Sequence, residues 1–69
     1  MVDVLTNNEI IEIKNWNSYK FAIGQIISYS YFYPNLQKRL HFFGKKPKEI
    51  IFNFIKLVCE KHNINLTFE

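Results

Sequence analysis

Two short runs of residues with strand-like character, residues 2–5 and 9–14, flank the dipeptide Asn7-Asn8. Both runs are rich in β-branched side chains or alternate between apolar and polar residues, as strands with one buried face do. Asparagine tolerates the positive φ that a two-residue hairpin loop needs. The pattern therefore predicts an N-terminal β-hairpin with Asn7 and Asn8 as its loop.

The predicted loop fixes which residues of the hairpin face each other. It pairs Thr6 with Glu9 and, further along the same two strands, Asp3 with Glu12. Strand alternation places Lys14 on the same face as Glu12. The other face is expected to be apolar and to pack into the core through Val2, Val4, Ile11 and Ile13.

The rest of the chain alternates between helical and strand patterns. Apolar residues at helical spacing predict a helix over residues 19–33, capped by Asn17 or Ser18 and stopped by Pro34. A strand over residues 38–43 follows.

Pro47 is a favourable first residue for a second helix, which is expected to run to about His62. A last short strand covers residues 66–68. The predicted fold is α/β in the order ββαβαβ, a four-stranded mixed sheet with an N-terminal antiparallel hairpin and two helices.

The length of 69 residues and the hydrophobic content of 48% indicate one folded domain, residues 1–69, of marginal stability. The apolar runs are too short to cross a bilayer, and the N-terminus lacks a signal-peptide pattern. With Cys59 as the one cysteine, we expect an intracellular, cytoplasmic protein with no membrane partner and a buried, inert thiol. Frequent Asn, Ile, Lys and Phe beside one Arg are typical of AT-rich genomes, including those of some large viruses and phages, in which case the protein acts in the host cell.

Two directly opposed carboxylates repel each other unless a cation neutralises them. Hard oxygen ligands suit Mg²⁺ or Mn²⁺, and Mg²⁺ typically uses one or two carboxylates together with water and phosphate oxygens. Asp3 and Glu12 fit that demand, and Lys14 is placed to serve a metal-activated water. The alternative is that these three residues form the solvated face of a hairpin, with Lys14 neutralising Glu12.

The segments Val2-Asp3-Val4, Ile11-Glu12-Ile13-Lys14 and Ala22-Ile23-Gly24-Gln25, with Tyr29 one turn later, resemble the motif series of the PD-(D/E)XK nucleases. The resemblance implies a restriction-endonuclease-like core in which Asp3 and Glu12 bind Mg²⁺ or Mn²⁺. It further implies that Lys14 assists the nucleophile, that Gln25 reaches the site from the helix and that Tyr29 flanks it, although ordinary helix packing also explains Tyr29. The implied activity is metal-dependent phosphodiester hydrolysis on nucleic acid, as a DNA endonuclease.

Members of that family usually carry a further helix and strand before the strand that bears the Asp. Without them, the strand over residues 2–5 is an exposed edge that invites pairing with a second copy, so we expect a homodimer or larger assembly. One alternative is a non-catalytic nucleic-acid-binding or assembly module that keeps the nuclease fold. Another is a self-associating structural protein in which the acidic pair is incidental.

A net charge of +3 and a pI near 9.1 favour an anionic partner. The expected partner is nucleic acid, and DNA above all. The basic residues expected to contact its phosphates are Lys20, Lys38, Arg39, Lys45, Lys46 and Lys48, with a purely solvated role as the alternative. His41 and His62 have no recognisable partner spacing and are assigned to structure or surface, and Trp16 is expected to pack at the turn from strand to helix.

Overall fold

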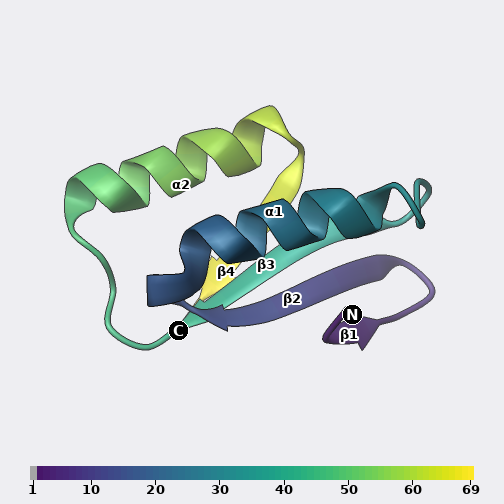
Figure 1. Cartoon of the computed structure of the whole chain (residues 1–69), viewed down its shortest axis with the longest axis horizontal. Coiled ribbons are helices and arrows are strands. Elements are labelled where there is room, and N and C mark those ends of the chain that lie inside the picture. The colour runs from purple at the N-terminus through teal and green to yellow at the C-terminus, as the bar shows by residue number, and fades with distance from the viewer. Residues whose placement is uncertain (1) are drawn as a thin grey trace.

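The computed structural model describes residues 2–69 and has the predicted α/β fold (Figure 1). Its elements confirm the ββαβαβ order, with a short 3₁₀ helix, η1, added between the second strand and the first α-helix. In chain order they are β1 (Val4–Leu5), β2 (Glu9–Asn15), η1 (Trp16–Ser18), α1 (Tyr19–Ser30), β3 (Gln37–Phe43), α2 (Glu49–Lys61) and β4 (Ile64–Phe68).

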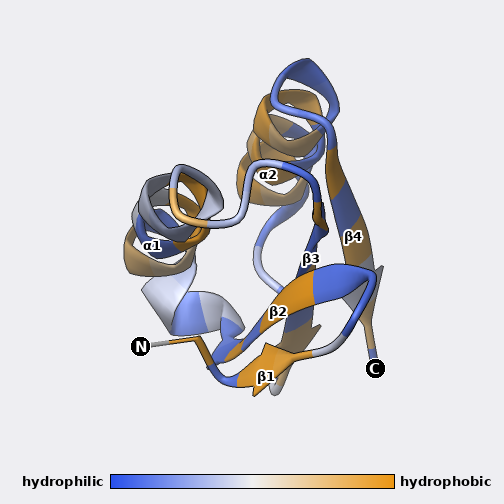
Figure 2. Ribbon diagram, turned by 90° about the vertical axis from the view of Figure 1, so that its right-hand side faces the viewer, coloured by the Kyte–Doolittle hydropathy of each residue, from blue (hydrophilic) through white to orange (hydrophobic). Residues whose placement is uncertain are grey.

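The four strands form one mixed sheet in the order β1-β2-β3-β4. β1 pairs with β2 antiparallel, and Val4 faces Ile11 in the predicted register. β2, β3 and β4 are parallel to one another, so their carboxyl ends meet at one edge of the sheet. Both helices begin at that edge and lie on the same side of the sheet (Figures 1 and 2).

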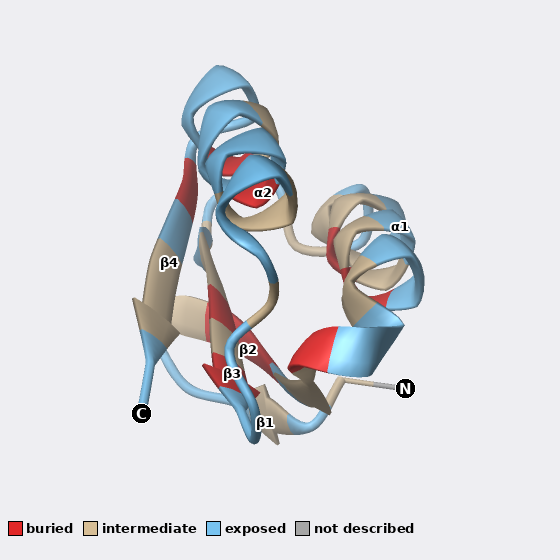
Figure 3. Cartoon of the chain, turned by 90° about the vertical axis from the view of Figure 1, so that its left-hand side faces the viewer, coloured by how far each residue is buried: buried red, intermediate tan, exposed pale blue. Residues whose placement is uncertain are grey.

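The core lies between the sheet and the two helices. Ile10, Leu40 and Phe42 are fully buried on the strands, and Ile26 and Ile55 are fully buried on the helices. Figure 3 shows buried segments of β2, β3 and α2 lining this space. Each such side chain contributes on the order of 1.5–3 kcal/mol through burial, which is what a domain of this size depends on.

Trp16 closes the core at the predicted turn from strand to helix. Its ring is 1% exposed and stacks on Phe42 with ring centroids 4.6 Å apart. Phe52 and Phe68 pack against the same indole at 5.8 and 5.5 Å. The helix after it starts as predicted but ends at Ser30, before Pro34, because Tyr31 and the residues that follow form turns.

The hairpin turn differs from the prediction. Among the described residues, Asn63 is the non-glycine residue with a positive φ, so Asn7 and Asn8 do not adopt the positive-φ turn that their residue type suggested. The hydroxyl Oγ1 of Thr6 instead accepts hydrogen bonds from the backbone N–H groups of Asn8 and Glu9, at 3.1 and 2.9 Å. The side chain of Thr6 therefore supplies the acceptor that stabilises the turn.

The predicted assignment of the two hairpin faces is wrong for Glu12 and Ile13, although Ile11 is buried at 6% exposure and Val2 packs against the core as expected. Glu12 lies beside Leu40 on the face that the helices cover and is 1% exposed, whereas Ile13 on the opposite face is 41% exposed. The reason is the pairing of β2 with β3, which carries the large apolar residues Leu40 and Phe42 on the same face as Glu12. The helices cover that face because its apolar area is greater, and Glu12 is buried with it.

The two glycines of the chain give a matched prediction for stability. Gly44 has φ +92°, and a Cβ at this position would lie 2.6 Å from Nδ2 of Asn15, whereas nothing lies within 4 Å of a Cβ at Gly24. We expect Gly44→Ala to lower the free energy of unfolding by about 1–3 kcal/mol because of strain. Gly24→Ala, inside α1, is expected to raise it by about 0.5–1 kcal/mol. Urea denaturation of both variants measures the difference, and equal effects would contradict the described turn at Gly44.

Candidate nucleic-acid interface and acidic site

One hydrogen bond joins Asp3 to Glu12, and a second joins Asp3 to Ile13, the residue after Glu12. The backbone N–H of Asp3 donates to Oε2 of Glu12 at 3.0 Å, and the backbone N–H of Ile13 donates to Oδ2 of Asp3 at 2.8 Å. Asp3 lies just before β1 rather than within it. At this end of the hairpin, hydrogen bonds from backbone N–H groups to the two carboxylates replace the backbone-to-backbone pairing of the strands. Nζ of Lys14 lies 3.9 Å from Oδ2 of Asp3. The structure therefore brings the three predicted residues together.

Glu12 is a buried carboxyl group with incomplete partners. Burial is the main cause that raises its pKa above the ordinary value, and the charge of Asp3 acts in the same direction. The hydrogen bond from the backbone of Asp3 and the charge of Lys14 lower it, but less than burial raises it. Oε1 of Glu12 is buried and has no hydrogen-bond partner. Burial therefore disfavours the ionised carboxylate, and Glu12 is stabilised when it binds a proton or when a cation lies beside it.

Glu12→Gln is expected to stabilise the domain at neutral pH by about 1–3 kcal/mol, because a neutral amide at this position carries no buried charge. The folded-state pKa of Glu12 is raised, so the folded protein binds its proton more tightly than the unfolded chain does. The free energy of unfolding of the wild type therefore falls as pH rises from about 4.5 through the raised pKa. The variant should lack this fall.

Thermal denaturation between pH 4 and pH 8, in about one-unit steps, measures that difference. Glu60→Gln, on α2, removes an equal charge from an exposed carboxylate and is the matched control. A wild type that is more stable than Glu12→Gln at pH 7 would contradict the account of the buried carboxyl group.

A hollow on the outer side of α1 adjoins these residues. It measures about 400 Å³ and is lined by Lys20, Phe21, Gly24, Gln25, Ser28 and Tyr29. Nζ of Lys14 lies 5.8 Å from the centroid of the Phe21 ring, which links the hollow to the acidic pair. The predicted residues Gln25 and Tyr29 therefore share one surface near Lys14. Phe21 is one of the apolar residues whose spacing predicts this helix, but it is 61% exposed and lies at this surface rather than in the core. Its place one residue after Lys20 is the sequence signal for that role.

The carboxyl ends of the parallel strands carry most of the lysines. Asn15 ends β2, and its side chain lies against Gly44 in the loop that leaves β3. This contact places the loop of residues 44–48 at the end of β2. Five of the nine basic residues gather at this edge, which we term the carboxyl-end lysines: Lys14, Lys20, Lys45, Lys46 and Lys48.

The other basic residues predicted to contact phosphates lie elsewhere. Lys38 and Arg39 are at the opposite end of β3, and Arg39 forms an ion pair with Glu9 at 3.4 Å.

Lys46, one of the carboxyl-end lysines, lies over aromatic rings, with its Nζ 4.1 Å from the centroid of the Phe52 ring. The carboxyl-end lysines share their edge with the acids Asp3, Glu49 and Glu69, so this edge keeps an excess of positive charge.

His41 has the structural role that the sequence suggested. Its Nδ1 is 2.7 Å from Oγ1 of Thr67 and its Nε2 is 2.9 Å from Oε2 of Glu69. These contacts connect β3 to the end of β4 on the open face of the sheet.

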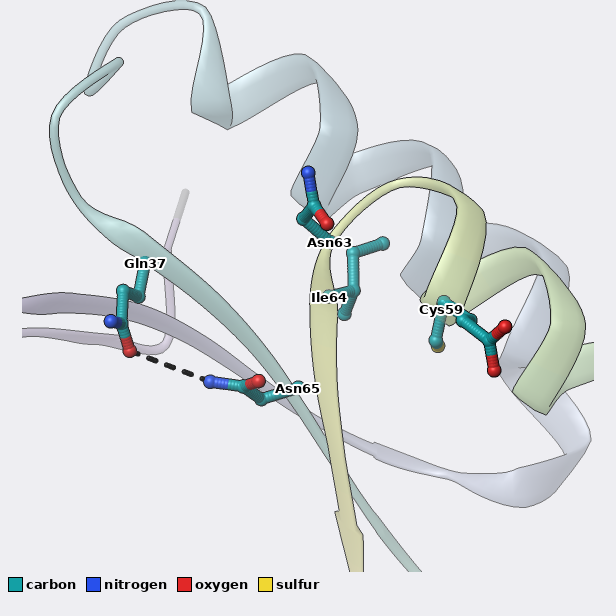
Figure 4. Close-up of a pocket in the computed structure, with 6 residues that line it drawn as sticks. Gln37, Cys59, Asn63, Ile64 and Asn65 are labelled. Carbon is teal, nitrogen blue, oxygen red and sulfur yellow. Dashed lines mark hydrogen bonds between the residues drawn. The ribbon is translucent and has the colours of Figure 1, made fainter.

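A polar pocket of about 450 Å³ lies at the amino ends of β3 and β4, at the edge of the sheet opposite the carboxyl-end lysines (Figure 4). Nδ2 of Asn65 donates to Oε1 of Gln37 at 3.5 Å across it. Cys59 is buried beside the pocket, and burial raises its pKa to about 11. The group is therefore a thiol rather than a thiolate at neutral pH and is not a nucleophile, as the sequence suggested.

Within residues 2–69, no cluster of three or more His, Cys, Asp or Glu side chains is arranged to hold a metal ion. Neither α1 nor α2, the two α-helices among those residues, has the length and apolar character needed to span a membrane.

Comparison with known proteins finds similarity to proteins of Acanthamoeba polyphaga mimivirus. The chain is 43% identical over 65 residues to the putative KilA-N domain-containing protein L33, 38% to R878 and 42% to L32. Each alignment covers 94% of this chain but only 26%, 18% and 17% of the respective relative. The chain thus spans about a quarter or less of these relatives. No protein-family model matches it, and no solved structure does.

Proposed function

We propose that this domain is a nucleic-acid-binding module that contacts phosphates through the carboxyl-end lysines. The observation that carries the proposal is their concentration at the edge where the parallel strands end, which is where open α/β sheets bind their ligands. Lysines on adjoining loops can follow a phosphate backbone without reading its sequence. Similarity to viral KilA-N domain-containing proteins accords better with a binding module than with a nuclease, and it supports action in an infected host cell.

The test is the salt dependence of binding. Fluorescence anisotropy of labelled 20-nucleotide DNA and RNA, at several salt concentrations, gives the slope of log Kobs against log[salt]. Three to five phosphate contacts predict a slope of about −2 to −4. A folded chain that binds neither nucleic acid at low salt would overturn the proposal.

The second candidate function is metal-dependent hydrolysis of phosphodiesters by a PD-(D/E)XK-like site. It is favoured by one observation, the buried Oε1 of Glu12 that lacks a partner beside a second carboxylate. Asp3 and Glu12 would hold Mg²⁺ or Mn²⁺, whose charge would replace the proton on Glu12. When bound, the cation would supply Lewis-acid activation of the phosphodiester and of a water molecule.

In that reaction the side chains of this chain would position the reactants. Lys14 would orient the attacking water and offset the negative charge that develops on the phosphate, and Gln25 would hold the water from α1. Mn²⁺ titration monitored by thermal denaturation tests the site without requiring activity. A rise in Tm for the wild type but not for Glu12→Gln, together with DNA cleavage that Lys14→Gln abolishes, would support hydrolysis. An unchanged Tm would exclude it.

The binding module is also proposed to pair with a second copy through β1. This strand is an edge of the sheet, and a hollow of about 400 Å³ beside it is lined by Val2, Leu5, Tyr29, Phe32 and Tyr33. Exposed apolar residues next to an unpaired edge favour association. Sedimentation equilibrium should show a dimer that Leu5→Glu dissociates. Leu57→Glu, at an apolar position on α2 that is 63% exposed against 51% for Leu5, is the control, and a monomeric wild type would contradict the pairing.

A further inference from the structure

The outer surface of α1 has an unusual composition for a solvated helix face. Gly24 and Gln25 come three and four residues after Phe21, and Ser28 comes four and three residues after them, so the four residues form one continuous stripe, which we term the α1 shelf. Phe21 is 61% exposed, and the hollow of about 400 Å³ lies along the shelf between Lys20 and Tyr29. This volume falls in the range of pockets that bind small molecules.

Gly24 has no packing reason to be glycine. Nothing lies within 4 Å of the position that a Cβ would occupy, and a glycine inside a helix costs about 1 kcal/mol relative to alanine. Because glycine has no side chain, the shelf has open space at Gly24, about one helical turn after Phe21. Gln25 also lines the hollow, and its Oε1 is buried and has no hydrogen-bond partner. The shelf therefore offers one exposed aromatic ring with open space at Gly24, beside an amide.

The charges around the shelf suit a nucleotide. Nζ of Lys14 lies 5.8 Å from the centre of the Phe21 ring, and Lys20 lines the hollow itself. An aromatic ring flanked by lysines combines a stacking surface for a base with cations for the adjacent phosphates. A base inside a duplex has both faces covered by its neighbours, so only an unpaired base can stack on Phe21.

We propose that the α1 shelf receives an unpaired base and that the ligand of this domain is single-stranded nucleic acid. The inference rests on the proposed binding function and specifies its substrate class. The base stacks on the ring of Phe21 over Gly24, Gln25 hydrogen-bonds to its edge, and Lys14 and Lys20 contact the neighbouring phosphates.

The test compares binding of single-stranded and duplex DNA of the same length and sequence by fluorescence anisotropy at one fixed salt concentration. The wild type should bind the single strand about tenfold more tightly, since stacking of one base contributes on that order. Phe21→Ala and Gly24→Leu should remove the preference, whereas Phe21→Trp should keep it. The two variants that should lose the preference, Phe21→Ala and Gly24→Leu, replace exposed residues, and thermal denaturation checks that they remain folded.

Gly24→Leu separates a binding defect from a folding defect, because leucine is a better helix former than glycine and has open space around it. It should therefore bind worse while melting at a higher temperature. Equal or tighter binding of duplex by the wild type, unchanged in both variants, would overturn the inference and leave the binding function standing. Failure to bind either form would overturn both.

Discussion

Replacing Lys45, Lys46 and Lys48 together by Gln is expected to weaken nucleic-acid binding by about 10- to 100-fold at moderate salt. Each lost phosphate contact lowers the magnitude of the salt slope by nearly one. The variant removes three of the five carboxyl-end lysines, so it should lose most of the electrostatic part of the binding free energy. The three lysines lie on the loop that Asn15 and Gly44 hold against the end of β2. Anisotropy titrations across a range of salt concentrations measure both the affinity and the slope.

The matched control replaces Lys38, Lys56 and Lys61 by Gln. It removes the same charge from β3 and α2, outside the loop that bears the three tested lysines. A long-range effect of net charge would weaken binding equally in both variants, whereas a localised interface requires a much larger loss in the first. Equal losses would contradict an interface at the carboxyl ends of the strands.

Phe42→Ala is expected to lower the free energy of unfolding by about 3–5 kcal/mol. Phe42 is fully buried and stacks on Trp16, so its removal leaves a cavity at the centre of the aromatic cluster. A domain of 69 residues has little stability to spare, and much of the variant should be unfolded at room temperature. Urea denaturation followed by the fluorescence of Trp16, the one tryptophan, measures the loss.

Phe43→Ala is the control for that measurement. The ring of Phe43 is 42% exposed on the opposite face of the same strand, so its removal should cost about 1 kcal/mol or less. Similar losses for the two variants would mean that the helices do not cover the face that carries Phe42.

The register of the hairpin was predictable from sequence because a short loop leaves few ways to pair two strands. The loop of Asn7 and Asn8 brings Val4 opposite Ile11, as observed. Which face of the hairpin is buried was not predictable from the hairpin alone. It depends on the pairing of β2 with β3, because Leu40 and Phe42 determine where the helices pack.

Part of the candidate site was predictable from the sequence, again because a short hairpin loop fixes which residues pair. Asp3, Glu12 and Lys14 come together because local pairing places them so, and the structure confirms that they are neighbours. The gathering of lysines follows from three parallel strands ending at one edge, which joins residues more than 20 positions apart. Sequence proximity instead grouped Lys38 and Arg39 with Lys45, although a whole strand separates them.

The measurement that tests the central claim most directly is mapping of the interface by NMR. A ¹⁵N-labelled sample is titrated with a single-stranded oligonucleotide, and the amide shifts are followed residue by residue. The account predicts that the largest changes fall at the carboxyl ends of the strands and along the α1 shelf, in residues 14–28 and 44–48. Changes centred instead on the polar pocket around Gln37, Asn63 and Asn65, at the opposite edge, would contradict it.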